Sequence, residues 1–236
     1  MNIRKLSPEL ARKAEEDFGE TYDRLQTDID ALRCWIEKQN HLISRKDDQF
    51  LVTFLRRCDF NLEDTKKRID SFLTCKSTSP DIYKNRSVDE TALEILKSGL
   101  VTIPPNSLPN CGPKVIISHF CKFDPKKHNF KDIVKVRFML FEILAFTDDV
   151  ASISGAELVF DLKNCSIKQA FYLQPAVLKK AVFYQEQCTP LRIKAIHIIN
   201  MKKELQSIVQ FARSIISAAE TAIPVRSKIV FEILNY

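Results

Sequence analysis

Residues 190–200 read PLRIKAIHIIN, and this stretch decides the fold that we expect for the chain. It predicts one strand that begins with cations and ends almost wholly apolar. Alternate side chains of a strand share a face, so we expect Arg192 and Lys194 to point the same way, with Ile196 and Ile198 behind them. Two cations followed by an apolar row indicate the mouth and the wall of a pocket.

A strongly amphipathic helix is expected directly after this strand, from residue 203 to about 220. Its apolar residues recur at intervals of three and four, which places them on one helical face. They are Leu205, Ile208, Val209, Ala212, Ile215, Ile216 and Ala219. Lys203, Gln206, Gln210 and Arg213 lie mostly opposite. The pattern on its own fits either a helix that caps a core or a lid over a pocket.

The rest of the chain predicts helices first, and then strands that alternate with helices. Residues 1–80 carry helical patterns throughout, beginning with Ser7-Pro8-Glu9, where a capping hydroxyl precedes a proline at the first helical position. Further strands are expected at 115–120, 157–162 and 228–234. Further helices are expected at 89–98, 132–146, 167–173 and 175–186. This order indicates an α/β fold with a largely parallel sheet behind an N-terminal helical unit.

Length and composition describe a globular chain. It has 236 residues, of which 45% are hydrophobic, enough for a substantial core. No apolar run reaches the roughly 18 residues of a transmembrane helix, and residues 1–8 lack the apolar segment of a secretory signal. The seven cysteines are scattered and form no CxxC pair. We therefore expect reduced thiols and a cytoplasmic protein.

Positive charge is concentrated in the last third of the sequence. Residues 162–236 contain 11 Lys and Arg, four Glu and no Asp, a net charge of +7, whereas the other 161 residues carry −1. Charge alone leaves open a nucleic acid, an anionic membrane and a merely solvated basic face. The cations are not interleaved with aromatic residues, so we expect no nucleic-acid partner.

The usual signatures of enzymes are missing from the sequence. The four glycines, at 19, 99, 112 and 155, allow neither a GxGxxG motif, nor a phosphate-binding loop, nor a GxSxG elbow. The four histidines form no HxxxH pair, and no spacing of His and Cys supports a metal site. We expect no catalytic residue, no metal and no cofactor, and we interpret His197 as a hydrogen-bonded core or pocket histidine.

Several segments resemble the CRAL-TRIO lipid-transfer family. Residues 54–61, FLRRCDFN, resemble its "FLRAR-F" helical segment, and residues 123–126, FDPK, resemble its "WDP" turn. Residues 159–162, VFDL, are similar to its "IFDLEG" strand. Residues 190–200 are close to its "YP-RFKAIHLIN" strand. The resemblance runs from about residue 5 to about 232 and is greatest to the branch of α-tocopherol-transfer and retinaldehyde-binding proteins, which is abundant in animals, insects included.

The resemblance implies an N-terminal helical domain over residues 1–80 and a lipid-binding domain over residues 81–236. In this family a mostly parallel sheet floors an apolar cavity, and a mobile amphipathic helix closes it. The implied function is that of a non-enzymatic, monomeric carrier of a hydrophobic lipid, such as a tocopherol-, retinoid-, carotenoid- or phospholipid-like molecule. The carrier would dock reversibly on membranes that contain phosphoinositides.

The resemblance also implies site residues. The gate helix would use Leu205, Ile208, Val209, Ala212, Ile215 and Ile216. The lipid pocket would be lined by Phe138, Phe141, Ala156, Phe160, Tyr184 and Ile196. Phosphoinositide head groups would bind Arg192, Lys194, Arg226 and Lys228. Candidates for polar groups that orient the lipid are Ser118, Tyr184 and His197.

Three features depart from the family pattern. Cys58 stands where the family has an arginine, and Phe141 stands where the branch often has a small residue, which would narrow the cavity. The chain ends at Tyr236, where the family continues for some tens of residues. These departures keep a second hypothesis open, in which the fold has lost its cavity and serves as an interaction or regulatory module.

Overall fold

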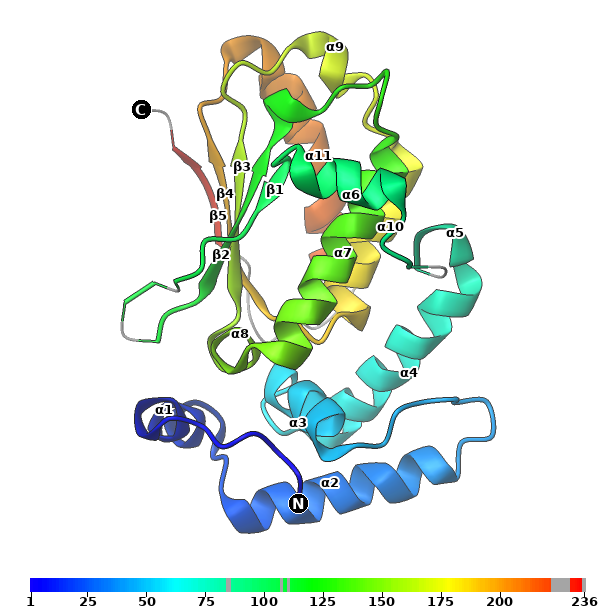
Figure 1. Ribbon diagram of the computed structural model, residues 1–236, viewed down its shortest axis with the longest axis vertical. Coiled ribbons are helices and arrows are strands. Elements are labelled where there is room, and N and C mark those ends of the chain that lie inside the picture. Colours follow the sequence, from blue (N-terminus) through cyan, green and yellow to red (C-terminus); the bar gives the residue numbers. More distant parts are fainter. Residues whose placement is uncertain (84–85, 107, 110, 222–229, 235–236) are drawn as a thin grey trace.

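The computed structural model describes residues 1–83, 86–106, 108–109, 111–221 and 230–234, and the description of side chains omits residues 170, 212 and those from 215 onward. The chain forms an α/β fold in which helical elements precede a five-stranded sheet (Figure 1). Among the described residues, no helix is both long enough and apolar enough to cross a bilayer.

The first part of the chain is helical, as the sequence predicts. Its helices are α1 (Pro8–Phe18), α2 (Tyr22–Glu37), α3 (Asp48–Arg57), α4 (Leu62–Thr78), the short α5 (Pro80–Tyr83) and α6 (Glu90–Lys97). Ser7, Thr21, Asp47, Asn61 and Asp89 each accept a backbone N–H bond at the start of a helix. Such caps satisfy N–H groups that have no partner inside the helix, and they explain where these helices begin.

The sheet is mixed and mostly parallel. Its strands, in both chain and spatial order, are β1 (Val101–Thr102), β2 (Lys114–His119), β3 (Ala156–Asp161), β4 (Ile193–Ile199) and β5 (Val230–Leu234). Strands β2 to β5 run parallel, whereas β1 pairs antiparallel with β2. The sequence predicts the four parallel strands but misses β1, because two residues are too few to show a period.

Helices connect the strands and cover one face of the sheet (Figure 1). They are α7 (Phe130–Thr147), α8 (Asp149–Ser154), α9 (Ile167–Ala170), α10 (Pro175–Phe183) and α11 (Gln206–Thr221). Short tight turns are η1 (Phe120–Lys122), the π-helical η2 (Tyr184–Cys188) and η3 (Lys203–Leu205). The helix expected from residue 203 is thus a 3₁₀ turn followed by α11.

The two faces of the sheet differ in character. Ile116, Leu158 and Ile196 are paired neighbours across β2, β3 and β4, and all are buried under the helices. On the opposite face, Val159 pairs with His197, whose Nε2 lies 3.1 Å from Glu157 Oε2. His197 is therefore turned away from the helix-covered face, which corrects its assignment as a group that orients a ligand.

The start of β4 differs from the simple alternation that the sequence predicts. The strand begins at Ile193, so Arg192 precedes it. Ala156 pairs with Ile193 but Glu157 pairs with Ala195, so Lys194 is the extra residue of a β-bulge. The expected row of Arg192, Lys194, Ile196 and Ile198 on one face is interrupted here, because a bulge changes which face follows.

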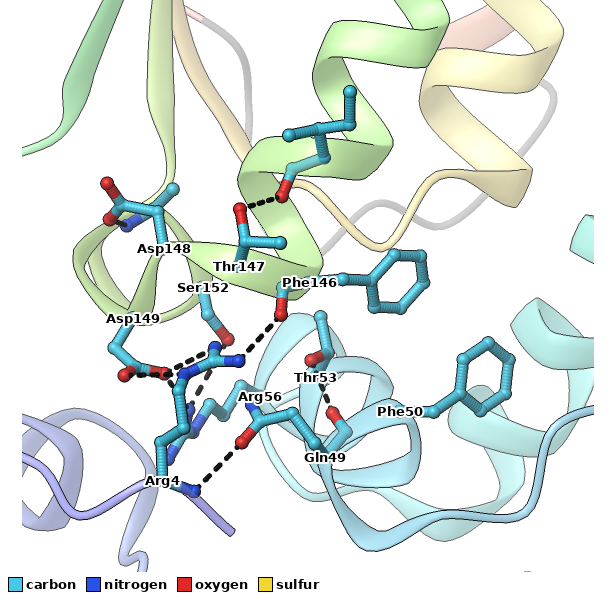
Figure 2. Close-up of polar contacts among 12 residues, drawn as sticks. Arg4, Gln49, Phe50, Thr53, Arg56, Phe146, Thr147, Asp148, Asp149 and Ser152 are labelled. Carbon is cyan, nitrogen blue, oxygen red and sulfur yellow. Dashed lines mark hydrogen bonds and ion pairs between the residues drawn. The ribbon is translucent and has the colours of Figure 1, made fainter. Parts of the chain in front are cut away.

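A polar joint fixes the N-terminal helices to the end of α7 and to α8 (Figure 2). The Arg4 guanidinium donates to both carboxylate oxygens of Asp149, at 2.9 and 3.0 Å, and to the carbonyl of Phe146 at 2.8 Å. Arg56, whose side chain is 0% exposed, donates to both oxygens of Glu20 at 2.7 and 2.8 Å. Its Nη1 also approaches Asp149 and the Ser152 hydroxyl.

Candidate functional site: an apolar pocket beneath α11

An apolar pocket of about 150 Å³ lies on the helix-covered face of the sheet. Phe160 of β3, with Ile196 and Ile198 of β4, forms its floor. Strand alternation explains this floor, because Ile196 and Ile198 are two residues apart and Phe160 pairs with Ile198. Of the six residues expected to form the pocket wall, Phe160 and Ile196 do line it.

The side walls come from α7, α9 and α10. Leu178, Ala181 and Val182 face the pocket from α10 at the spacing of one helical face. Phe130 and Arg137, seven residues apart on α7, form another wall. Gln169, Ser166 and Gln185 add a few polar groups.

The amphipathic segment at η3 and α11 covers the pocket. Leu205, Ile208 and Val209 line it from this side. Leu205 packs with Leu162, Cys165 and Ile198 in a small cluster that is separate from the main core. The apolar periodicity of the sequence therefore identified three of the covering residues. Ala212, Ile215 and Ile216 belong to α11, but their side chains lie outside the described part of the structure.

Four residues expected in the wall are packed elsewhere. The Tyr184 ring stacks on Tyr83 at 4.6 Å and lies 4.5 Å from the Phe138 ring, and its hydroxyl donates to Glu142. Phe138 is next to Arg137 in sequence, so the helical rotation turns it away from the pocket. Phe141 packs edge-on against Phe138 and is fully buried. Ala156, also fully buried, begins β3 and does not line the pocket.

Sequence reasoning missed Arg137, which brings a charge into the apolar pocket. Its Cζ lies 5.4, 5.7 and 5.9 Å from the ring centres of Phe138, Phe141 and Phe160. No hydrogen bond or ion pair to Arg137 is found within the described residues, and its Nε is buried without a partner. Burial lowers the pKa of Arg137 to about 10, so the side chain is cationic at neutral pH.

The aromatic rings compensate this burial only in part. A cation over an aromatic ring gains about 0.5–2 kcal/mol per contact. Removing a guanidinium from water costs several kcal/mol unless an anion and hydrogen bonds replace the water. The sequence does show Arg137 as a cation within a helix that is apolar on most of its faces. It does not show that the side chain points into the pocket.

Basic residues gather at the start of β4. Arg192 is 7% exposed, and its Nη2 donates to the carbonyls of Arg56 and Arg57 and to Asp59, at 2.7, 3.1 and 2.5 Å. The Lys194 side chain reaches solvent, and the partial desolvation of its ammonium group, followed by the charge of Arg192, lowers its pKa. Arg226 and Lys228 lie outside the described residues. The structure thus brings Arg192 and Lys194 together, with Arg192 held by the N-terminal helices.

Two further arginines extend this group. Burial, followed by the charges of Arg68 and Arg192, lowers the pKa of Arg57 to about 9. Arg68 Nη1 donates to the carbonyl of Thr189, at 3.3 Å. Charges that act on one another in this way lie close together. Arg57, Arg68, Arg192 and Lys194 are called the basic cluster below.

Two family patterns match the chain. The pattern of the CRAL/TRIO domain matches residues 104–232, more than half of the chain, which include the sheet and the lining residues of the pocket. The chain belongs to the CRAL/TRIO domain family. The pattern of the Pinta-like UBA domain matches residues 21–93 of this CRAL/TRIO protein, within its helical region.

Individual relatives agree with this membership. Clavesin-1 of Pongo abelii is 29% identical over 199 residues, covering 83% of this chain and 55% of that protein. Alpha-tocopherol transfer protein-like of Homo sapiens is 25% identical over 205 residues, covering 86% and 59%. The chain therefore spans less than two thirds of both relatives. The crystal structure of Sfh5 shares the fold, with a TM-score of 0.54 at 15% identity over 90% of this chain and 81% of that one.

Proposed function

We propose that this CRAL/TRIO protein is a non-enzymatic carrier that holds a hydrophobic lipid in the pocket beneath α11. The observation that carries the proposal is the apolar pocket itself, which an amphipathic helix covers with Leu205, Ile208 and Val209. Membership of the CRAL/TRIO family and similarity to a protein named as transfer protein-like support it. In this function α11 acts as the gate, because its side chains must move before a lipid can enter.

Burial supplies the affinity of such a carrier. A ligand that buries about 400 Å² of apolar surface gains on the order of 10 kcal/mol at roughly 25 cal/mol/Å². Ordering and association costs remove much of this gain. A few polar groups then fix the orientation of the ligand. Gln169, Gln185 and Ser166 line the pocket and are available for this role.

Exposed aromatic side chains surround the covered pocket and support membrane docking. Phe171 is 80% exposed and Tyr172 54%, and both follow α9 next to the lining residue Leu173. Phe211 of α11, two residues after the lining residue Val209, is 53% exposed. Aromatic rings favour the membrane interface. Docking through them would bring the gate against the lipid surface.

The basic cluster is our candidate for the phosphoinositide site. Lys194 is exposed, and Arg192 lies beside it. Each cation near an anionic membrane contributes about 1 kcal/mol, so a few give weak and reversible docking. A head group that pulled Arg192 from Asp59 would also loosen the contact between the start of β4 and the turn after α3, and it would bias the gate towards opening.

Lipid extraction tests the carrier function. Protein purified from its native source is analysed by native mass spectrometry and lipidomics, beside an Ala181→Trp variant expressed and purified in the same cells. We expect a co-purifying lipid in the natural protein and its loss from the variant, because the indole fills the pocket. A folded natural protein that is consistently empty would contradict the carrier function and favour the interaction module.

Vesicle binding tests the docking site separately. The double variant Arg192→Ala/Lys194→Ala is compared with the natural protein on vesicles with and without phosphatidylinositol phosphates. Release of bound lipid is followed in parallel. We expect the phosphoinositide-dependent part of docking and release to fall. If both are unchanged in a variant that remains folded, the basic cluster is not the docking site.

A further inference from the structure

We propose that the carried lipid ends in a carboxylate, and that Arg137 binds this carboxylate at the inner end of the pocket. The inference rests on the proposed carrier function and names the class of ligand. A long-chain fatty acid or another monocarboxylic lipid has the required chemistry. The residues that cover the pocket, Leu205, Ile208 and Val209, are apolar. The carboxylate would therefore lie at the inner end beside Arg137, and the hydrocarbon chain would extend towards α11.

The first argument is that Arg137 has no anionic partner. It is the one charged residue among the described lining residues of the pocket. Within the same part of the chain, Tyr83 is the one ionisable group found to act on its pKa besides the effect of burial. No hydrogen bond to its guanidinium is found there either. A buried cation normally has a counter-ion, and the open space beside Arg137 is where that ion can bind.

The second argument compares Arg137 with other buried or largely buried arginines of the same molecule. Three of them face a carboxylate within the protein. The pairs are Arg56 with Glu20, Arg86 with Glu142, and Arg192 with Asp59. The protein thus pairs these three arginines with its own acids. Arg57 and Arg68, for which no ion pair is found among the described residues, belong to the basic cluster instead. Arg137, which lines the pocket, lies instead among the rings of Phe138, Phe141 and Phe160.

The third argument concerns the size of the anion. A smaller cavity of about 20 Å³ adjoins the pocket, and Arg137, Phe120 and Phe130 line both. Ser118, which is buried on the helix-covered face of β2, also lines this small cavity. It holds little more than one water molecule, so a substituted phosphate head group does not fit there, whereas one oxygen of a carboxylate beside Arg137 can enter it. One guanidinium balances one negative charge, and its planar fork matches a carboxylate.

A pair of probes that differ only in the terminal group tests this inference. Delipidated protein is equilibrated by dialysis with radiolabelled oleic acid or oleyl alcohol, each below its aggregation limit. We expect the natural protein to bind oleic acid at least tenfold more tightly than oleyl alcohol. We expect Arg137→Met to weaken oleic acid binding by roughly 10- to 100-fold, the range for a charge-assisted hydrogen bond, and to leave oleyl alcohol binding within about threefold.

Two matched variants control for charge and folding. Arg137→Lys keeps the charge and should retain part of the preference for the acid. Lys179→Met removes an exposed cation next to the lining residue Leu178 and should change neither dissociation constant. Binding of oleyl alcohol by Arg137→Met shows that the pocket of this variant is intact. The ratio of the affinities of the natural protein for the acid and the alcohol tests the inference without any variant.

The remaining outcomes separate this inference from the carrier function. Equal affinity for both probes, or an Arg137→Met variant with unchanged affinity for oleic acid, would overturn the carboxylate while leaving the carrier intact. Binding of neither probe, together with tight binding of phosphatidylcholine that Arg137→Met weakens, would replace the carboxylate by a phosphate. Binding of no lipid at all would overturn the carrier function and the inference with it.

Discussion

Two arginines, the fully buried Arg56 and the half-buried Arg137, occupy opposite situations in this protein. Arg56, which lies beside Asp149 and Ser152 in the joint between the N-terminal helices and α8 (Figure 2), is fully enclosed and donates to both oxygens of Glu20. Arg137, in the wall of the pocket, lies among aromatic rings and has an unpartnered Nε. The first charge is compensated by the fold. The second has no such compensation among the described residues, and we assign its compensation to a ligand.

The partner of each arginine distinguishes a structural role from a functional one. Burying a charge costs several kcal/mol in either case, so the partner decides what the residue does. With Glu20 in place, Arg56 ties α3 to the segment between α1 and α2, and Asp149 extends the tie to α8. Without such a partner, Arg137 destabilises the empty protein and favours a bound anion.

Substitution of Arg56 should have the largest effect. Arg56→Met leaves Glu20, whose side chain is 6% exposed, without its cation. Removal of one partner from a buried pair costs about 3–5 kcal/mol, so we expect the free energy of unfolding in urea to fall by that amount. Arg33→Met is the control, because Arg33 pairs with Asp30 and Asp48 in a more exposed setting. Equal losses in the two variants would contradict the role of the joint.

Bound lipid should have the next largest effect. A ligand that binds only the folded state stabilises it by about 2.7 kcal/mol at a concentration 100 times its Kd. We therefore expect delipidation to lower the midpoint of thermal unfolding and re-addition of a fatty acid to restore it. The Ala181→Trp variant, with its pocket filled, should show no such dependence. A midpoint that ignores the lipid in the natural protein would speak against binding in the pocket.

Substitution of Arg137 should act in the opposite direction to that of Arg56. In lipid-free protein we expect Arg137→Met to raise the free energy of unfolding by about 1 kcal/mol, because it removes a buried cation that lacks an anion. Methionine has an unbranched apolar side chain that replaces the aliphatic part of the arginine side chain. Chemical unfolding of the delipidated variant measures the change. A loss of 3 kcal/mol or more, as for Arg56→Met, would mean that Arg137 is a structural residue.

Substitution of Lys194 should have the smallest effect. Lys194 is exposed at the bulge of β4, so Lys194→Ala should leave the free energy of unfolding within about 0.5 kcal/mol. Loss of about 1 kcal/mol of membrane attraction corresponds to roughly fivefold weaker binding to phosphoinositide vesicles. Arg192→Ala, by contrast, should also lower stability, since Arg192 bonds to Asp59. Co-sedimentation with vesicles distinguishes the two variants.

Local patterns predicted much of the fold. Alternation predicted Ile196 in the pocket wall, and the family resemblance added Phe160. Helical spacing predicted the shared face of Leu205, Ile208 and Val209, and the resemblance placed that face over the pocket. The surroundings of Arg56 and Arg137 were beyond such patterns. Glu20 lies 36 residues from Arg56 in sequence, so only the packing of the helices brings them together.

Other misses have similar physical causes. The bulge at Lys194 follows from the register between β3 and β4, which no single strand encodes. Phe138 and Tyr184 were expected in the pocket wall, but their rings pack against each other and against Tyr83 instead. Large aromatic residues at helical spacing suit a core as well as a pocket, and the sequence does not distinguish the two.

The most direct test of the account is photoaffinity labelling of the pocket. A fatty acid with a diazirine in its chain is bound to delipidated protein and irradiated, and the labelled peptides are identified by mass spectrometry. We predict label on peptides that contain Phe160, Ile196 or Leu205, and its loss when excess oleic acid competes. Label confined to the opposite face of the sheet, around Val159 and His197, or label that oleic acid does not displace, would contradict a lipid site beneath α11.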